Sequence, residues 1–312
     1  MPLPTGLDGI GRRDPSLYAV GALSAGGLVT AAYLIIAHRD PAMFHRLVGS
    51  LPADALVYAH IDARADLAPF SSCPRDIRFL SDPLEPNWGS WTMVEATARL
   101  LEAALGDATV SRCTLISGQC YPILAPSAFA SWELAPVDRL EIVPAPNAET
   151  HKYAWRYERR WSGSGYPHPH SPAVVVSSAL NRRFGRRLDP LTPLAGRRLF
   201  AGTAWWSFTR RTAEHAAEVA RNDRALTRYF SHTYCPDEAF WHTVVAEFLD
   251  SSSVGCEPTY AKWLGSAHPA PLSPEDLIRE ARSGRFAFAR KFSSDQTDLL
   301  DLVDRLRTGK AA

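Results

Sequence analysis

The chain has 312 residues, of which 46% are hydrophobic and 21% are charged, enough apolar material for the core of one large domain. Its 34 basic and 33 acidic side chains nearly cancel, leaving a formal net charge of +1. This balance excludes the global positive field that draws proteins to nucleic acid or anionic lipid. We therefore expect no nucleic-acid partner, and any recognition of anions has to be local.

Five cysteines are scattered along the sequence, and no two of them form a CxxC pair of the kind that binds zinc. They are also too few for the disulfide framework of a small secreted domain. We interpret them as reduced thiols and expect a cytoplasmic protein.

The first element to interpret is an uncharged run at residues 17–37, about 21 residues long, which is the length of a membrane span. Small residues interrupt its middle, and its end, AAYLIIA, has the composition of a buried strand. Since a core strand cannot also cross a bilayer, we expect no membrane association. Arg12 and Arg13 leave a signal peptide as the alternative, so residues 17–30 are either a core element or a targeting signal. Residues 1–30 are otherwise a lead-in segment.

A strand, a helix and a second strand open the ordered part of the chain. They are expected at residues 32–37, 41–51 and 55–61, with Asp40 as the helix N-cap and Pro41 at its first position. The alternation continues, with elements expected at residues 77–80, 92–105, 113–117, 202–208, 212–222, 237–249 and 297–307. This order predicts an α/β fold with a mostly parallel central sheet flanked by helices, forming a single domain over residues 31–312.

Residues 144–199 differ in composition from the rest of the chain. Proline, glycine and histidine cluster in SGSGYPHPHSP, and HKYAWRYERRW mixes aromatic and cationic side chains. We interpret the segment as an insertion over the active-site face, either facing the substrate or forming a solvated excursion of the surface.

Polar residues follow the predicted strands, where parallel sheets bind their ligands. His38 follows the first strand, His60 and Asp62 the second, and Ser117 with Gly118 the strand at 113–117. We therefore predict a ligand site at this edge of the sheet.

Seven blocks in chain order resemble one known family. They are AHRDPAMFHRLVGSL, VYAHIDARAD, NWGSWTMVEATARLLEAAL, LISGQCYPI, LFAGTAWWSFTRR, YCPDEAFWHTVV and FAFARKF. Together they make the chain similar to the core-2/I-branching β-1,6-N-acetylglucosaminyltransferase and peptide O-xylosyltransferase family over roughly residues 31–300. The resemblance implies a GT-A nucleotide-sugar fold and an inverting transfer without the metal-binding DxD motif. Its donor is a UDP-sugar, N-acetylglucosamine first, and its acceptor is a glycan or a glycosylated small molecule.

The resemblance implies that Glu238, in the PDE block, is the catalytic base. An inverting transfer is a single displacement, so a carboxylate has to accept the proton of the attacking hydroxyl. Asp237 is expected to cap a helix that begins here, with Glu238 in its first turn. Taken from the residues alone, the favoured interpretation is that the two acids neutralise a helix N-terminus.

No DxD stands at the end of an apolar strand, and the nearest carboxylates, Asp62 and Asp66, are four residues apart. We therefore expect no divalent metal and no other cofactor, so a lysine or arginine has to stabilise the leaving diphosphate. The resemblance assigns this role to Lys291. Relatives also supply an arginine upstream, which this chain lacks, and Lys262 and Arg290 are the candidates to replace it.

The remaining predicted contacts follow from the same blocks. The nucleotide is expected to meet the residues His38, Arg39, His60, Asp62, Trp88 and Gly89. The donor and acceptor sugars are expected to meet Ser117, Gly118, Gly202, Thr203, Trp205, Trp206 and Asp237. Glycines at 89 and 202 would allow a ligand close to the backbone, and the two tryptophans either stack on a sugar or fill the core.

One position departs from the family pattern. Cys120 stands in LISGQCYPI where relatives usually carry an acid. The alternatives to N-acetylglucosamine transfer are therefore a UDP-xylose or UDP-glucuronic acid transferase of the same fold, or a carbohydrate-binding protein without catalysis.

Overall fold

The computed structural model describes residues 30–161, 176, 179–180, 183–249, 254–264 and 269–309. The predicted lead-in, with nearly all of the apolar run at 17–30, lies outside these residues.

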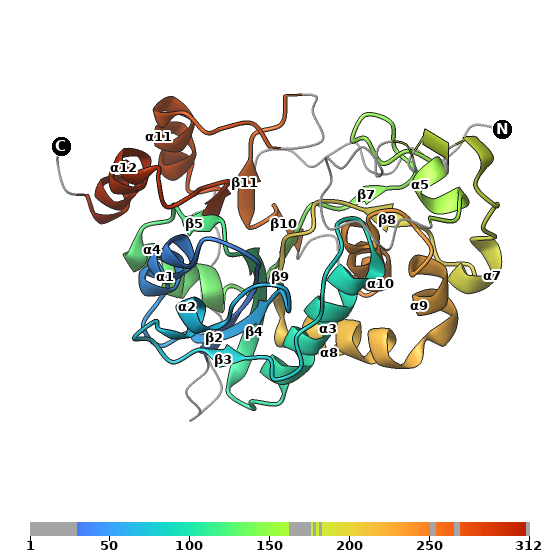
Figure 1. The fold of residues 1–312 in the computed structure, drawn as a ribbon, viewed down its shortest axis with the longest axis horizontal. Coiled ribbons are helices and arrows are strands. Elements are labelled where there is room, and N and C mark those ends of the chain that lie inside the picture. The colour runs from blue at the N-terminus through green and yellow to red at the C-terminus, as the bar shows by residue number, and fades with distance from the viewer. Residues whose placement is uncertain are drawn as a thin grey trace.

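A seven-stranded sheet in the order β10-β6-β9-β4-β1-β2-β3 forms the centre of the fold (Figure 1). Its strands are β1 Thr30–Ala37, β2 Leu56–Ile61, β3 Arg78–Phe79, β4 Val110–Ser117, β6 Asp138–Leu140, β9 Trp206–Thr209 and β10 Val254–Gly255. β1 pairs in parallel with β2 and β4, as the opening strand-helix-strand pattern predicted.

The sheet is mostly parallel, as expected, and one reversed strand makes it mixed. β9 runs antiparallel to both of its neighbours, β4 and β6. It carries the chain away from the edge where β4 ends and into helix α8, Arg210–Asn222. The local hydrophobic pattern of a buried strand is the same in either direction, so the sequence did not indicate this reversal.

Helices cover both faces of the sheet, and β1 is buried on each side. Tyr33 and Ile35 pack into one core cluster, and Leu34 and Ile36 into the other. The remaining helices among the described residues are α1 Pro41–Ser50, α2 Ala68–Ser71, α3 Trp91–Leu105, α4 Pro126–Leu134, α5 Trp155–Glu158, α7 Leu191–Leu194, α9 Arg224–Phe230, α10 Phe240–Ala246, α11 Pro274–Ser283 and α12 Thr297–Thr308.

The predicted start of α1 is confirmed. The Asp40 Oδ1 atom accepts a hydrogen bond from the backbone N–H of Met43 at 3.1 Å, and Pro41 is the first helical residue. The other oxygen, Oδ2, accepts from the backbone N–H of Ser294 at 2.8 Å. The same cap therefore fixes the loop that follows Lys291 beside the end of β1.

Two small sheets complete the strand pairing. β12, Phe288–Arg290, lies between β11, Thr259–Ala261, and β5, Cys120–Pro122. β7, Val143–Pro144, pairs with β8, Phe200–Ala201. β5 begins three residues after β4 ends, so its pairing with β12 brings the FARKF block to the end of the central sheet.

Two predicted elements differ in the structure. Of the strand expected at 202–208, only residues 206–208 lie in a strand, β9, and residues 202–205 form a non-strand stretch that follows β8. The helix expected at 237–249 consists of a 3-10 turn, Pro236–Glu238, followed by α10. No side chain caps either one, so the capping role expected of Asp237 is wrong. Cys235, at φ 49°, begins the 3-10 turn instead.

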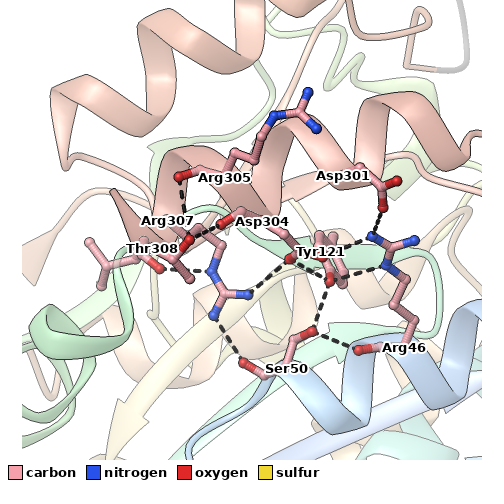
Figure 2. A network of polar contacts seen from close by, with 9 residues as sticks. Arg46, Ser50, Tyr121, Asp301, Asp304, Arg305, Arg307 and Thr308 are labelled. Atoms are coloured by element: carbon pink, nitrogen blue, oxygen red, sulfur yellow. Dashed lines mark hydrogen bonds and ion pairs between the residues drawn. The ribbon is translucent and has the colours of Figure 1, made fainter. Parts of the chain in front are cut away.

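Polar contacts fix the C-terminal helix α12 against α1 and β5 (Figure 2). The Tyr121 hydroxyl donates to the Asp304 carboxylate at 2.8 Å, and Arg46 of α1 donates to the same carboxylate at 2.8 Å. Arg307 donates to the backbone oxygens of Leu124 and Ser50, each at 3.0 Å. β5 is therefore held by α1 and α12 in addition to its pairing with β12.

All five cysteines are free, in agreement with the interpretation as thiols. No helix in the described part of the chain combines the length and the apolar character that a bilayer crossing requires.

Candidate active site

The ends of β1, β2 and β4 meet at one edge of the sheet, as predicted. The backbone N–H of Asp62 donates to the carbonyl of Ala37 at 2.9 Å, and that of Gly118 donates to the carbonyl of Ile36 at 2.9 Å. A Cβ atom on Gly118 would lie 2.7 Å from the Cβ of Ala37, so this crossing requires a glycine. The small size of Gly118 thus lets the backbone pass close to β1. The sequence had predicted a sugar contact at this residue.

Asp62 lies at this edge with its carboxylate held by Arg64. The Nε of Arg64 donates to Oδ1 at 2.9 Å, and a second guanidinium nitrogen donates to Oδ2 at 2.5 Å. Burial alone would raise the pKa of Asp62, but the hydrogen bonds from Arg64 outweigh it and lower this pKa. The carboxylate is therefore ionised at neutral pH, and a ribose hydroxyl would share it with Arg64.

His60 is a core residue, which corrects its assignment to the nucleotide. Its side chain is inaccessible to solvent, and its Nε2 accepts the backbone N–H of Leu84 at 2.9 Å. Side chains alternate across a strand, and this alternation directs His60 toward the sheet face covered by α3.

Two cations, Arg39 and Lys291, gather with His38 at the end of β1. Burial and then the charges of Arg39 and Lys291 lower the pKa of His38. Burial and then Arg290 and Arg39 lower the pKa of Lys291 to about 8. Lys291 has no hydrogen bond or ion pair with the residues that the structure describes. The site therefore holds a lysine charge without a protein anion, beside a second cation.

Gln119 connects these cations to the chain after β12. The guanidinium of Arg39 donates to the Gln119 side-chain oxygen at 3.3 Å. The backbone N–H of Phe292 donates to the Gln119 carbonyl at 3.0 Å, and the Gln119 side-chain amide donates to the Phe292 carbonyl at 3.3 Å. Sequence reasoning missed Gln119, although it stands inside the LISGQCYPI block.

Lys262, which was predicted to contact the diphosphate, is paired with a carboxylate in the structure. Its Nζ donates to the Asp276 carboxylate at 2.8 Å, and Asp276 closes a capping box with Ser273 at the start of α11. The sequence SPED at residues 273–276 is the signal for the start of this helix, which the sequence analysis did not predict.

Glu238 is held by two buried cations. Its Oε2 accepts from Lys152 Nζ at 2.6 Å and from Arg156 Nη2 at 2.7 Å. The two cationic side chains are 8% and 7% exposed, whereas that of Glu238 is 28% exposed. Burial alone would raise the pKa of Glu238. The charges of Lys152 and Arg156 outweigh it and lower this pKa to about 2. The carboxylate is therefore ionised and reachable from solvent.

Both cations come from the segment predicted to be an insertion. Backbone hydrogen bonds join Asn147 and Lys152 in both directions, at 2.8 and 2.7 Å. The carbonyl of Arg156 accepts the backbone N–H of Tyr234 at 3.0 Å, just ahead of the PDE turn. Sequence reasoning missed both residues. Their signal was the mixture of aromatic and cationic side chains in HKYAWRYERRW, and they support the alternative in which the segment faces the substrate.

Asp237 differs from its neighbour Glu238. Its Oδ1 is buried and has no hydrogen-bond partner among the described residues. Burial and the negative charge of Glu238 raise the pKa of Asp237 to about 7. Two adjacent carboxyl groups thus have their pKa values pushed apart, an arrangement typical of sites that move protons.

Gly202 packs against protein, which corrects its expected contact with a ligand. Its backbone N–H donates to the Glu238 carbonyl at 2.9 Å. A Cβ atom at this position would lie 2.6 Å from His242 Nε2 and still closer to the carbonyl oxygen of Glu141. The glycine lets the chain before β9 pass directly beside the PDE turn.

Substitution of Gly202 by alanine is expected to destabilise the protein by roughly 1–3 kcal/mol or more, because backbone on both sides has to shift. The free energy of unfolding from denaturant titration measures it. Gly49→Ala is the matched control, since a Cβ there meets no atom within 4 Å. Within a helix this control is expected to be neutral or stabilising by up to about 1 kcal/mol. Equal stabilities of the two variants would contradict the packing account.

The structure separates the two tryptophans. Trp206 is fully buried and stacks on Phe208 with ring centroids 4.0 Å apart, so it fills the core. Trp205 carries the guanidinium of Arg290 over its ring at 4.5 Å from the centroid. The stacking role on a sugar is therefore wrong for Trp206, and Trp205 serves first as the platform of Arg290.

The remaining predicted residues lie close to these groups. Trp88 packs edge-on against Tyr234 at 5.5 Å, and the Gly89 carbonyl accepts the backbone N–H of Cys235 at 3.0 Å. This places Trp88 and Gly89 beside the PDE turn, whereas they were assigned to the nucleotide. The hydroxyl of Thr203 donates to the backbone oxygen of Trp205 at 3.5 Å. The hydroxyl of Ser117 is hydrogen-bonded to the Cys120 Sγ at 3.4 Å.

No group of three or more His, Cys, Asp or Glu side chains within the described ranges is placed to hold a metal ion.

The fold and the side chains described above define an α/β protein with cations at the carboxyl ends of its strands and an ionised, partly exposed carboxylate on the PDE turn. The chain matches the family Branch, Core-2/I-Branching enzyme, over residues 31–281, and it belongs to this family, which has a GT-A-like glycosyltransferase fold. The family resemblance seen in the sequence is thereby confirmed. A search of curated proteins finds no match.

Proposed function

We propose that this glycosyltransferase is an inverting, metal-independent enzyme that transfers a sugar from a UDP-sugar to a hydroxyl group, with Glu238 as the base. The observation that carries the proposal is the ionised, partly exposed Glu238 carboxylate in a site that also holds Lys291, a cation without an ion-pair partner among the described residues. The acceptor is a glycan or a glycosylated small molecule. Release of UDP that depends on both donor and acceptor tests the proposal, and binding of UDP without turnover would contradict it.

The low pKa of Glu238 is compatible with a base in this reaction. The acceptor hydroxyl becomes strongly acidic as its oxygen bonds to the anomeric carbon, so a weak carboxylate base suffices at that stage. Asp237, with a pKa of about 7, is the stronger base of the two. We favour Glu238 because 28% of its side chain is exposed, whereas the Asp237 Oδ1 is buried.

Lys152→Met is expected to shift the acid limb of the kcat/KM profile to higher pH. The base has to be ionised, and Lys152 is one of the two cations that keep the pKa of Glu238 at about 2. Without it the pKa should rise toward the ordinary value of about 4.3. The variant should therefore lose activity as the pH falls from about 6 to 4, a range in which the wild type is unaffected by this group.

Lys262→Met is the matched control for this profile, because Lys262 is paired with Asp276. Circular dichroism at each pH confirms that both variants stay folded. Identical acid limbs for the Lys152 variant and the wild type would show that Lys152 does not set the basicity of the catalytic group.

Stabilisation of the leaving diphosphate is assigned to Lys291, with Arg39 beside it. Negative charge develops on the bridging oxygen as the sugar departs, and a preorganised cation in a partly dry site stabilises it. Lys262, paired with Asp276, is replaced by Arg39 in this proposal.

N-Acetylglucosamine is the donor sugar that the family resemblance favours, with a β linkage in the product. Xylose and glucuronic acid are the alternatives. A panel of UDP-sugars, compared by UDP release, decides among them, and strong turnover of xylose alone would contradict the first choice.

A further inference from the structure

Arg290 is a cation whose charge has no protein partner in the described part of the chain. It ends β12, its guanidinium lies over the ring of Trp205 at 4.5 Å, and its Nε is buried without a hydrogen-bond partner. No hydrogen bond or ion pair joins the rest of this guanidinium to the residues described. It is therefore a positioned but unpaired charge.

The residue opposite Arg290 in the sheet is Cys120. β12 and β5 run antiparallel with Arg290 directly across from Cys120, and such pairs place their side chains on the same face. The Cys120 thiol is fully buried, and its Sγ accepts the backbone N–H of Ser117 at 3.4 Å. A neutral thiol thus occupies the position from which a carboxylate would compensate Arg290.

Glu238 does not provide the missing charge. It acts electrostatically on Arg290, but its Oε2 is occupied by Lys152 and Arg156. A guanidinium that is partly withdrawn from water without an anion is unfavourable, and a ligand that brings an anion would relieve this cost.

The place of Arg290 indicates which part of the ligand carries that anion. Lys291, the next residue, is assigned to the diphosphate, and Glu238 is assigned to the acceptor hydroxyl. In a single displacement the transferred sugar lies between the leaving group and the base. Arg290 interacts electrostatically with both Lys291 and Glu238, which is consistent with a position beside this sugar.

We propose that Arg290 binds a carboxylate on the transferred sugar, and that Cys120 determines this preference by leaving the guanidinium uncompensated. A guanidinium stacked on an aromatic ring presents its edge to a planar carboxylate, which it can bind with two parallel hydrogen bonds. The inference rests on the proposed function. Within it, this chain's own residues favour a UDP-uronic acid over the N-acetylglucosamine donor that the family resemblance favours.

Equilibrium binding tests the proposal without an acceptor. Dissociation constants are measured by calorimetry for UDP, UDP-glucose and UDP-glucuronic acid, of which the last two differ only at the sugar C6. The wild type is expected to bind UDP-glucuronic acid at least about tenfold more tightly than UDP-glucose. Arg290→Gln is expected to abolish this difference while the affinity for UDP stays within about threefold.

Cys120 provides an independent pair of variants that leaves Arg290 in place. Cys120→Asp is expected to remove the preference for UDP-glucuronic acid, because its carboxylate pairs with Arg290 and repels the sugar carboxylate. Cys120→Asn has the same shape without the charge and is expected to keep the preference. Loss of the preference in both variants would overturn the role of charge at this position.

Two further results would overturn the inference. One is equal affinity of the wild type for the two UDP-sugars. The other is an Arg290 variant that binds UDP and both UDP-sugars about equally more weakly, which would place Arg290 on the diphosphate. In either case UDP still binds, so the proposed function stands. Failure to bind UDP at all would overturn the proposed function and this inference together.

Discussion

Replacement of Glu238 by glutamine is expected to lower kcat by roughly 10² to 10⁴, the usual range for loss of a general base. Glutamine keeps the shape of the side chain and an oxygen that can accept from Lys152 and Arg156, which donate to Oε2 at 2.6 and 2.7 Å. It cannot take the proton of the acceptor hydroxyl. UDP release under saturating donor and acceptor measures the change, and the affinity for UDP should be unchanged.

Asp237→Asn is the matched control, since it makes the same chemical change one residue earlier. Because the Asp237 Oδ1 is buried, this variant should lose far less activity than the Glu238 variant. A larger loss in the Asp237 variant would transfer the role of base to the carboxyl group whose pKa is about 7.

Replacement of Lys291 by methionine is expected to weaken UDP binding by about 10- to 100-fold. Hydrogen bonds to charged groups contribute about 1.5–3 kcal/mol, and each 1.4 kcal/mol is a factor of about ten. The wild type should also bind UDP more weakly as the pH rises from about 7 to 9. Burial and then the nearby charges of Arg290 and Arg39 lower the pKa of Lys291 to about 8, so its charge is lost in that range. The variant should lack this dependence. Calorimetry across this pH range measures both effects.

Lys262→Met serves as the control, because it removes a lysine charge that is paired with Asp276. Its UDP affinity should match that of the wild type. A chelator should leave the activity of the wild type unchanged. Loss of transfer with a chelator and its recovery with manganese would contradict the assignment of the leaving-group charge to Lys291.

Much of the framework could be predicted because its signals are local. Asp40 and Pro41 mark the start of α1, and the runs that became β1, β2 and β4 place polar residues at one edge of the sheet. The order of seven short blocks then indicated the family, which the match over residues 31–281 confirms.

What the sequence did not indicate is the direction of one strand and of several side chains. The sequence does not distinguish a histidine that ends in the core, as His60 does, from one that faces a ligand. Trp205 and Trp206 are adjacent and belong to one core cluster, but their rings have different partners, the guanidinium of Arg290 for Trp205 and Phe208 for Trp206. β9 is a buried strand in either direction, and only its pairing with β4 and β6 shows that it is reversed.

By itself the sequence indicated the order of most elements, the edge of the sheet at which a site is predicted, and the candidates Glu238 and Lys291. Only the tertiary structure decided what surrounds them. Lys152 and Arg156 lie more than 80 positions from Glu238 in the sequence, and Cys120 lies 170 positions from Arg290. Contacts over such separations depend on how the whole chain packs, and no local period or spacing records them. The charge state of the site is set by these distant neighbours, because a pKa responds to burial and to the nearest charges.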